Sequence, residues 1–396
     1  MKLVRNLKLA LGGIAVAGLA ACGGGGGGGG GGAETGRLNL AVTDAPACGY
    51  DAVNVTIEKV RVHQSSSASD TEGGWSEIVL SPALRIDLLS LQNGALAELG
   101  EVTLPTGSYN QMRLVLADNK GASPLANSVV LTSDKSVIAL TTPSGQQSGV
   151  KAKQFNIDIA ANQLAKFVID FDACKSIVAT GSGKYNLKPQ LSVIPRYVSG
   201  VAGSVDLALA NGFTSVSLQQ GGVVVKATTP ASTGKFLLQP VAPGSYTLVM
   251  TAPGRSTSVV TNVVVATELV TTINGSTTAF NPAASASATV TGTAPADTLV
   301  RVLQPLTPAL TGGTPTTVEI AGRFVDGITG SYSYPLVVNA PLVAPYVALP
   351  GALVFTSDTA AAGKYTLRAS LNGVDKTMVL GTLASGATIT TNFTFP

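Results

Sequence analysis

Apolar and polar residues alternate along most of this chain, and this period of two constrains its fold more than any other feature of the sequence. Clear examples are Leu38/Leu40/Val42, Val53/Val55/Ile57, Phe155/Ile157/Ile159 and Phe167/Ile169/Phe171. A period of two places every second side chain on the same face of a strand, as in a sheet that is buried on one side. The one helix-like stretch, 89–99, is interrupted by Asn93-Gly94. The pattern therefore predicts an all-β protein.

Changes in the pattern of alternating runs and turns divide the chain into three units. Residues 34–196 carry the first set of alternating runs, 197–280 a second set, and 281–396 a third set interrupted by Pro-rich turns. About 160 residues are enough for the first unit to bury a two-sheet core. We therefore expect tandem β-sandwich modules, Ig-like or prealbumin-like. Trp75, Phe155, Phe167, Ile169 and Phe171 are expected in the core of the first.

A short motif recurs in all three units, in which a glycine turn is followed by a tyrosine at the start of a strand. Its copies are Gly107-Ser108-Tyr109, Gly183-Lys184-Tyr185, Gly244-Ser245-Tyr246 and Gly363-Lys364-Tyr365. Glycine can adopt positive φ in the turn, and the aromatic ring then covers the core. Common hairpin chemistry accounts for part of this repetition, and related sandwich modules account for the rest.

The N-terminus has the layout of a bacterial lipoprotein signal. The positive residues Lys2, Arg5 and Lys8 precede a short apolar run, 9–19, and Leu19-Ala20-Ala21 leads into Cys22. Residues 1–21 are therefore expected to be a signal peptide, with Cys22 as the first mature residue and the site of lipid attachment. The apolar run of about eleven residues is too short for a transmembrane helix, which needs roughly 20.

An unbroken run of glycines, 23–32, follows Cys22. It predicts a flexible tether (22–33) with an r.m.s. span of roughly 17 Å, although an expansion without a selected length is the alternative. Because Gly23 is not the aspartate that retains lipoproteins in an inner membrane, we expect a lipid anchor in the outer membrane. The membrane is thus the first expected partner.

Charge argues against a nucleic-acid partner. The chain has 25 Lys and Arg against 22 Asp and Glu, and three of the positive residues leave with the signal, so the mature net charge is 22 − 22 = 0. No basic run survives to contact phosphates. The charged fraction is 12%, against ~25% in an ordinary globular domain. Such a composition is typical of secreted β-rich modules.

Two cysteines remain after Cys22, namely Cys48 and Cys174. An even pair in an exported chain predicts one disulfide, and two buried free thiols are the alternative. The bridge would stabilise the fold by ~2–5 kcal/mol. A zinc site is poorly supported, because His63 is the single histidine and tetrahedral sites need four ligands.

Several motifs occur in order within the first unit and carry a family resemblance. They are Leu40-Ala41-Val42-Thr43-Asp44-Ala45-Pro46, Asp87-Leu88-Leu89, Leu104-Pro105-Thr106-Gly107-Ser108-Tyr109, Asp170-Phe171-Asp172 and Tyr185-Asn186-Leu187-Lys188-Pro189. Over 34–196 the chain resembles the bacterial lipoprotein domain-of-unknown-function family 4382. The resemblance implies a β-rich extracytoplasmic domain of unassigned function and no catalytic residues.

The second unit is similar to carboxypeptidase regulatory-like, transthyretin-type modules. The similarity lies in Gly234-Lys235-Phe236 and Val241-Ala242-Pro243-Gly244-Ser245-Tyr246-Thr247-Leu248. That fold family includes carbohydrate binders, which is an implication from fold alone. The third unit resembles such modules only loosely.

The sequence contains no complete catalytic or metal-binding motif among those considered below. No Gly-x-Ser-x-Gly motif occurs, and Gly181-Ser182-Gly183-Lys184 lacks the flanking residues of a phosphate loop. His63 is expected to be a solvated histidine at a strand end. Asp170 and Asp172 share a strand face and could bind calcium with Asp44 or Asp87, but solvated acids are the simpler expectation. Asp44 is expected to stabilise the turn at Pro46.

These patterns predict no catalytic residues, metal or cofactor. The expected function is a membrane-anchored, non-enzymatic binding or adhesion lipoprotein of the cell envelope, with a glycan or an envelope protein as its partner. The alternative is a structural or assembly component of the envelope, and an enzyme ranks third. A composition with 5% aromatic residues weakens the case for a broad aromatic glycan platform.

Overall fold

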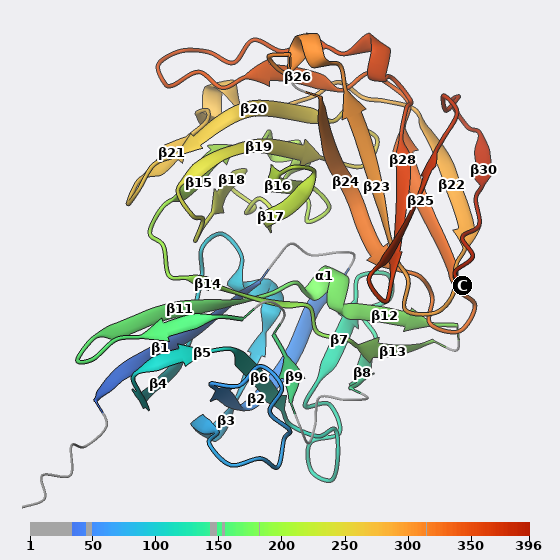
Figure 1. The fold of residues 1–396 in the computed structure, drawn as a ribbon. Helices are drawn as coiled ribbons and strands as arrows, with labels where there is room; N and C mark the ends of the chain where they lie inside the picture. Colours follow the sequence, from blue (N-terminus) through green and yellow to red (C-terminus); the bar gives the residue numbers. More distant parts are fainter. Residues whose placement is uncertain (1–33, 45–49, 143–148, 153–154, 182, 314) are drawn as a thin grey trace, which may run out of the picture.

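The computed structural model describes residues 34–44, 50–142, 149–152, 155–181, 183–313 and 315–396. Within these ranges the regular structure is almost entirely β-strand (Figure 1), which confirms the all-β prediction. The longest helical segments are η1 (Leu88–Leu91) and α1 (Ala173–Ser176). The signal peptide, Cys22, the glycine run and Cys48 lie outside the described residues, so their roles remain predictions.

Two main sheets build the first unit. One sheet has the order β14-β11-β1-β4, and the larger one has the order β12-β13-β8-β7-β2-β6-β9, with β3 also paired to β2. A short pair, β10-β5, completes the unit. The bounds are β1 Thr35–Asp44, β2 Tyr50–His63, β3 Ser76–Asp87, β4 Ala97–Pro105, β5 Gly107–Tyr109, β6 Gln111–Leu116, β7 Ser128–Leu131, β8 Val137–Thr141, β9 Val150–Lys151, β10 Ile157–Ile159, β11 Leu164–Phe171, β12 Ile177–Thr180, β13 Lys184–Leu187 and β14 Leu191–Pro195.

The second unit also has two sheets, β18-β15-β21 and β17-β16-β19-β20-β26-β27. Its bounds are β15 Gly200–Ser204, β16 Ser215–Gln220, β17 Val223–Thr228, β18 Lys235–Leu238, β19 Gly244–Thr251, β20 Ser258–Val265 and β21 Val270–Thr272. The last two strands of the larger sheet, β26 (Leu342–Pro345) and β27 (Thr356–Ser357), come from the third part of the sequence.

The third unit consists of the sheets β25-β22-β30 and β24-β23-β28-β29. Its bounds are β22 Ser287–Thr293, β23 Leu299–Leu306, β24 Thr316–Phe324, β25 Ser331–Val337, β28 Thr366–Leu371, β29 Val374–Val379 and β30 Thr388–Thr390. Figure 1 shows the second and third units side by side above the first, with α1 at the junction.

Each unit has its own hydrophobic core, built from the alternating residues of its strands. In the first core, Phe155, Ile169 and Phe171 are buried as expected, and Phe167 packs against it half-buried. Separate clusters form around Val201–Phe280 and Ala288–Phe393. A fourth, smaller cluster joins Val249 and Val259 to Leu306 and Val318, so the second and third units share apolar contacts.

The segment 342–357 crosses from the third unit into the second, which the sequence did not predict. Strand β26 pairs in parallel with β20 and extends its sheet. Tyr346, Leu353 and Phe355 pack against the second core, and the Phe355 ring meets Phe280 edge-on with 5.9 Å between ring centroids. The core of the second unit is therefore completed by residues that come later in the sequence than strands β22 to β25 of the third unit.

The prediction that Trp75 is buried in the first core is wrong. Trp75 is half-buried on the outer face of the large sheet, where the guanidinium carbons of Arg61 and Arg113 lie 4.5 and 5.0 Å from its ring centroid. Its indole N–H donates to the carbonyl oxygen of Ser69 at 2.9 Å. The Trp75 ring is therefore packed by cation–π contacts with arginines of two strands, and not by the apolar core.

The recurrent glycine–tyrosine motif has a common role in two of its copies. The hydroxyl of Tyr109 donates to the carbonyl of Pro105 at 3.1 Å, and that of Tyr246 donates to Ala242 at 2.8 Å. Both bonds reach back four residues and close the turn before the strand, as the tyrosine corner of Ig-like sandwiches does. Tyr365 instead donates to Val337.

Candidate functional site: the cleft between the three units

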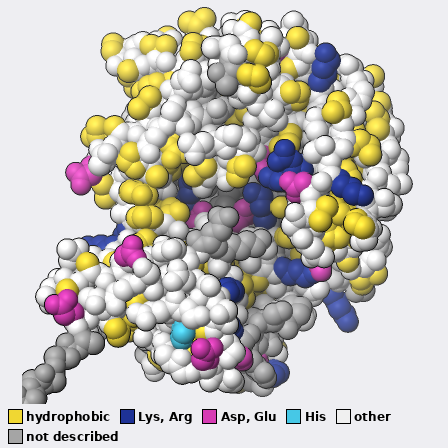
Figure 2. Space-filling model, viewed as in Figure 1, with side chains coloured by type: hydrophobic (Ala, Val, Ile, Leu, Met, Phe, Trp, Pro, Cys, Tyr) yellow, Lys and Arg dark blue, Asp and Glu magenta, His cyan; other side chains and the backbone are white. Residues whose placement is uncertain are grey.

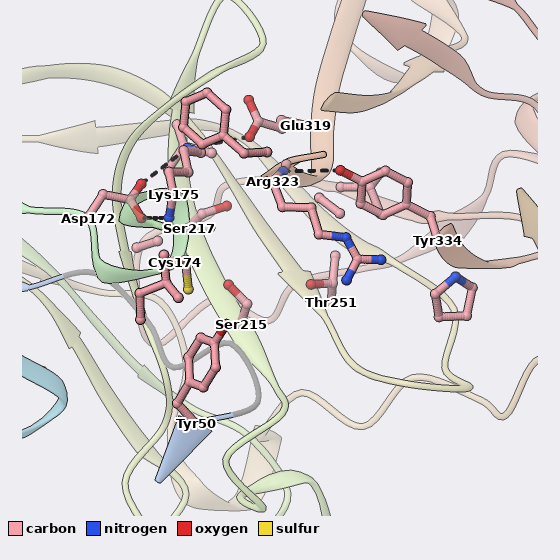
Figure 3. Close-up of a pocket in the computed structure, with 18 of the residues that line it drawn as sticks. Tyr50, Asp172, Cys174, Lys175, Ser215, Ser217, Thr251, Glu319, Arg323 and Tyr334 are labelled. Atoms are coloured by element: carbon pink, nitrogen blue, oxygen red, sulfur yellow. Dashed lines mark hydrogen bonds and ion pairs between the residues drawn. The ribbon is translucent and has the colours of Figure 1, made fainter. Parts of the chain in front are cut away.

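A cleft of about 450 Å³ lies where the three units meet. Its walls come from α1 and β12 of the first unit, from β16, β17 and β19 of the second, and from β24 and β25 of the third. Figure 2 shows charged side chains gathered around a hollow in this face, and Figure 3 shows the residues that line it. Edge strands of three sheets, β12, β17 and β24, meet here.

The segment from Asp172 to Lys175 forms part of the first-unit wall. Strand β11 ends at Phe171, and the carboxylate of Asp172 then accepts a hydrogen bond from the Lys175 backbone N–H at 2.9 Å, which caps α1. An aspartate at the N-cap satisfies a backbone donor that the helix leaves unpaired. The short helix turns the chain so that the Lys175 side chain lies at the junction.

Lys175 and Glu319 form an ion pair across the first and third units. The Lys175 ammonium lies 3.3 Å from Asp172 and 3.6 Å from Glu319, and Arg301 lies 3.8 Å from the other Glu319 oxygen. Burial of Glu319, whose side chain is 4% exposed, raises the pKa of its carboxyl. Burial acts against the charge of Lys175, but Asp172 and Glu319 together raise the pKa of its ammonium. Lys175 therefore stays charged at neutral pH.

The backbone of Glu319 is held by the second unit. Its N–H donates to the Gln219 side-chain oxygen at 2.7 Å, and its carbonyl accepts from the Gln219 amide nitrogen at 2.8 Å. Gln219 is 1% exposed. One glutamine side chain thus occupies both outward groups of Glu319 at the edge of β24, as a neighbouring strand would.

A second buried ion pair joins the first and second units. The Lys226 ammonium lies 2.7 Å from the Asp170 carboxylate, with side chains 3% and 12% exposed, and also donates to the Asp44 carbonyl at 3.3 Å. Asn93 adds polar contacts between the same units, because its N–H donates to the Thr228 hydroxyl and its amide to the Thr229 carbonyl.

Arg323 and Tyr334 form the third-unit side of the mouth. The Arg323 guanidinium carbon lies 4.6 Å from the Tyr334 ring centroid. The Tyr334 hydroxyl accepts from the Arg323 backbone N–H at 3.1 Å and donates to the Val300 carbonyl at 2.5 Å. Burial raises the pKa of Tyr334 above its usual range. In Figure 3 the guanidinium extends between Tyr334 and Thr251.

Tyr50 and a pair of hydroxyl side chains face this arginine. Tyr50 meets Tyr185 edge-on at 6.3 Å, and burial raises its pKa to about 12 although the Arg323 charge acts in the opposite direction. Tyr50 therefore keeps its proton at neutral pH. Ser215 and Thr251 lie opposite one another on β16 and β19 and both line the cleft.

The acids singled out from the sequence are partly or fully buried, and each has a partner within the protein. Asp170 pairs with Lys226, Asp172 caps α1, and Asp87 accepts from the backbone N–H groups of Val53 and Leu89. Asp44 is 1% exposed and accepts from the N–H of Ala173 at 2.9 Å, so it fixes the start of α1. Within the described ranges no three His, Cys, Asp or Glu side chains come together as metal ligands.

The remaining candidates take structural positions. His63 ends β2 as expected, but the prediction that it is solvated is wrong, because it is 8% exposed. Its Nε2 donates to the Gly73 carbonyl at 3.0 Å and its Nδ1 accepts from Ser65 N–H at 2.9 Å. Lys184, from the stretch compared with a phosphate loop, is the first residue of β13. Cys174 lines the cleft, and because Cys48 is outside the described residues, their pairing stays a prediction.

Sequence reasoning missed five residues that line the cleft or hold the units together around it. These are Gln219, Lys226, Arg301, Glu319 and Arg323. A signal was present for two of them: Lys226 and Glu319 are single charges within runs of apolar and Thr residues, Val223-Val224-Val225-Lys226-Ala227 and Thr316-Thr317-Val318-Glu319-Ile320. A charged residue is rarely buried unless it is paired, so each such residue implies a partner elsewhere.

The fold and the cleft define a tandem, all-β protein with no catalytic cluster recognised among its described residues. Residues 35–189 match the family model described as "Domain of unknown function (DUF4382)", in agreement with the resemblance of the first unit. No curated protein matches the chain. Among the described residues, none of the helices has the length and hydropathy that a membrane crossing requires.

Three solved structures are similar to parts or most of the chain. The cohesin–X-dockerin complex from Acetivibrio cellulolyticus matches with 21% identity and a TM-score of 0.17, over 20% of this chain and 53% of that chain. The Streptococcal ancillary pilin matches with 11% identity and a TM-score of 0.13, over 90% and 98%. The Corynebacterium diphtheriae major pilin SpaA matches with 9% identity and a TM-score of 0.16, over 91% and 100%. The chain thus spans about half the length of the first of these, and no function is taken from scores this low.

Proposed function

We propose that this protein is a lipid-anchored, non-enzymatic binding protein of the bacterial cell envelope, whose three units act as one rigid body. The observation that carries the proposal is the segment from Asp170 to Lys175, which receives Lys226 from the second unit and Glu319 from the third. Domains joined by a flexible linker usually move relative to one another unless their interface is large and well packed. Buried ion pairs on both sides of one short segment oppose such motion.

Contacts between the three units stabilise their relative arrangement. Lys226 and Glu319 are 3% and 4% exposed, so packed residues enclose both of the ion pairs that join the units. Separation of the units would break these pairs and expose the apolar surface packed around them, including the cluster of Val249 and Val259 with Leu306 and Val318. The arrangement therefore favours a fixed cleft, which is the feature that a binding protein requires.

The anchor is the second part of the proposal. Acylated Cys22 and the glycine tether would hold this body near the outer membrane, with room to orient its cleft. The rigidity of the body also favours the alternative function, a structural or assembly component of the envelope. The two differ in whether the cleft takes a ligand.

Fractionation and ligand capture test the proposal. Full-length protein should partition with outer membranes and shift in intact mass by its acyl groups, whereas Cys22→Ser should remain unprocessed or be released in soluble form. Glycan-array binding by the purified protein would support the binding function. Absence of glycan binding, together with a crosslinked envelope protein at sites outside the cleft, would favour the structural alternative. An unmodified Cys22 in membrane fractions would contradict the anchor.

A further inference from the structure

We propose that the cleft binds a carboxylated saccharide and that Arg323 anchors its carboxylate; this inference rests on the proposed binding function. Two cations line the cleft, Lys175 and Arg323. Lys175 is neutralised by Asp172 and Glu319. Arg323 has no ion pair with any carboxylate of the described chain, and the ranges outside it contain no Asp or Glu. One positive charge at the mouth is therefore available to a ligand.

The guanidinium of Arg323 is held in an orientation that suits a carboxylate. Its central carbon lies 4.6 Å from the centroid of the Tyr334 ring, whose hydroxyl is fixed by the Arg323 N–H and the Val300 carbonyl. The residue is exposed, so a ligand can reach its guanidinium, and two parallel N–H donors match the two oxygens of a carboxylate. Because the ring holds the group in place, less side-chain entropy is lost when a ligand binds.

The other lining residues suit a sugar ring. Tyr50 offers an aromatic ring together with a hydroxyl that stays protonated, since burial raises its pKa to about 12. Ser215 and Thr251 supply two hydroxyls on adjacent strands. A saccharide has both an apolar C–H face and a hydroxyl-rich edge, so it can use both kinds of surface. The volume of about 450 Å³ lies within the usual range of small-molecule sites, ~300–1,000 Å³.

An acidic peptide is a weaker candidate for the same charge. An extended peptide gains most of its affinity when it adds as a strand to a free sheet edge. Along the cleft side of β24, Gln219 occupies both backbone groups of Glu319. The Gln219 side chain thus already closes this edge at Glu319, so a peptide strand could not pair continuously along it.

Calorimetric titration of the full-length protein in detergent tests this proposal. The probes are short oligomers of galacturonate and of glucuronate, each compared with its neutral methyl ester. We expect the acidic oligomer to bind, and its affinity to fall as salt is added, whereas the ester should bind at least on the order of tenfold more weakly, as expected for a lost charge-assisted pair. Arg323→Gln should weaken binding of the acid by a similar factor and leave binding of the ester unchanged.

Two further variants keep the result interpretable. Arg85→Gln removes an exposed arginine of β3 that does not line the cleft and should leave binding unchanged. Arg323→Lys keeps the charge but not the planar pair of donors, so it should restore affinity only in part. Thermal unfolding of each variant should match the parent, since Arg323 is exposed.

Several results would overturn the inference. They are equal affinity for acid and ester, unchanged binding by Arg323→Gln, stronger binding of oligoglutamate than of either saccharide acid, and no binding of any uronate probe. A negative result here leaves the lipid anchor to be judged separately by fractionation. The failure of the ligand class and the failure of the envelope location can thus be told apart.

Discussion

Lys226 of the second unit lies 2.7 Å from Asp170 of the first, and its side chain is 3% exposed. Asp170→Ala should destabilise the protein by about 3–5 kcal/mol, because it leaves the ammonium buried without its carboxylate. The double variant Lys226→Met/Asp170→Leu should recover most of this loss, since apolar replacement of both partners removes the two desolvation costs together. Urea unfolding gives the free energies.

A surface pair of equal length serves as the control for that experiment. Lys135 and Asp51 are also 2.7 Å apart, but their side chains are 67% and 36% exposed. Asp51→Ala should leave the free energy of unfolding nearly unchanged, because water screens an exposed ion pair. Equal losses from Asp51→Ala and Asp170→Ala would contradict the role given to burial.

Buried tyrosines predict a loss of stability in alkaline solution. Burial raises the pKa of Tyr50 and Tyr332 to about 12, and raises those of Tyr334 and Tyr365 further. A raised pKa means that the unfolded chain releases these protons first, so the free energy of unfolding is unaffected well below pH 10 and falls as the pH rises above it. Urea unfolding between about pH 9 and about pH 11 measures this slope.

Tyr365→Phe provides the matched test of that pH dependence. The substitution removes the hydrogen bond to Val337 and should lower stability at every pH, but it should also reduce the alkaline slope. A slope that is identical in the variant and the parent would show that Tyr365 titrates normally in the folded protein.

Phe355 should couple the stability of the second and third units. Phe355→Ala removes the ring that contacts Phe280 and is expected to cost about 2–3 kcal/mol, below the usual ~3–5 for a fully buried ring, because Phe355 is only half-buried. Hydrogen exchange in β20 should accelerate, since β26 pairs with it. Val354→Ala, at a neighbouring residue that is 73% exposed, should change stability by no more than ~0.5 kcal/mol.

The single tryptophan should report on the arginines that cover it. Arg61→Gln removes one of the guanidinium groups that lie within 5.0 Å of the Trp75 ring centroid, so acrylamide should quench its fluorescence more efficiently. Arg85→Gln, on the neighbouring strand β3, should have no effect. Unchanged quenching in Arg61→Gln would mean that the ring is covered by other groups.

The predicted bridge between Cys48 and Cys174 can be tested by thiol counting. Denatured, unreduced and delipidated protein should show no free thiol at either position, and the double variant Cys48→Ser/Cys174→Ser should be less stable by roughly 2–5 kcal/mol. Two reactive thiols in protein isolated from the periplasm would favour the alternative of buried free cysteines.

The strands were predictable because burial on one face leaves a local trace. Leu38, Leu40 and Val42 alternate in the sequence and all lie in the first core. The contacts around the cleft produce almost no local sequence pattern. Gln219 and Glu319 are 100 residues apart, and neither segment contains a signal that identifies its partner. Trp75 was misplaced for a related reason: its partners, Arg61 and Arg113, lie on two other strands, and only the sheet register brings them together.

The parallel pairing of β1 with β11 has a mechanical consequence. Eight successive residues are in register, from Arg37 opposite Leu164 to Asp44 opposite Phe171, and β1 also pairs along its other edge with β4. A pull on the N-terminal end of β1 acts along the strand, at right angles to these hydrogen bonds. The bonds would share the load in shear instead of opening one at a time, so the first strand of the body is well placed to withstand tension.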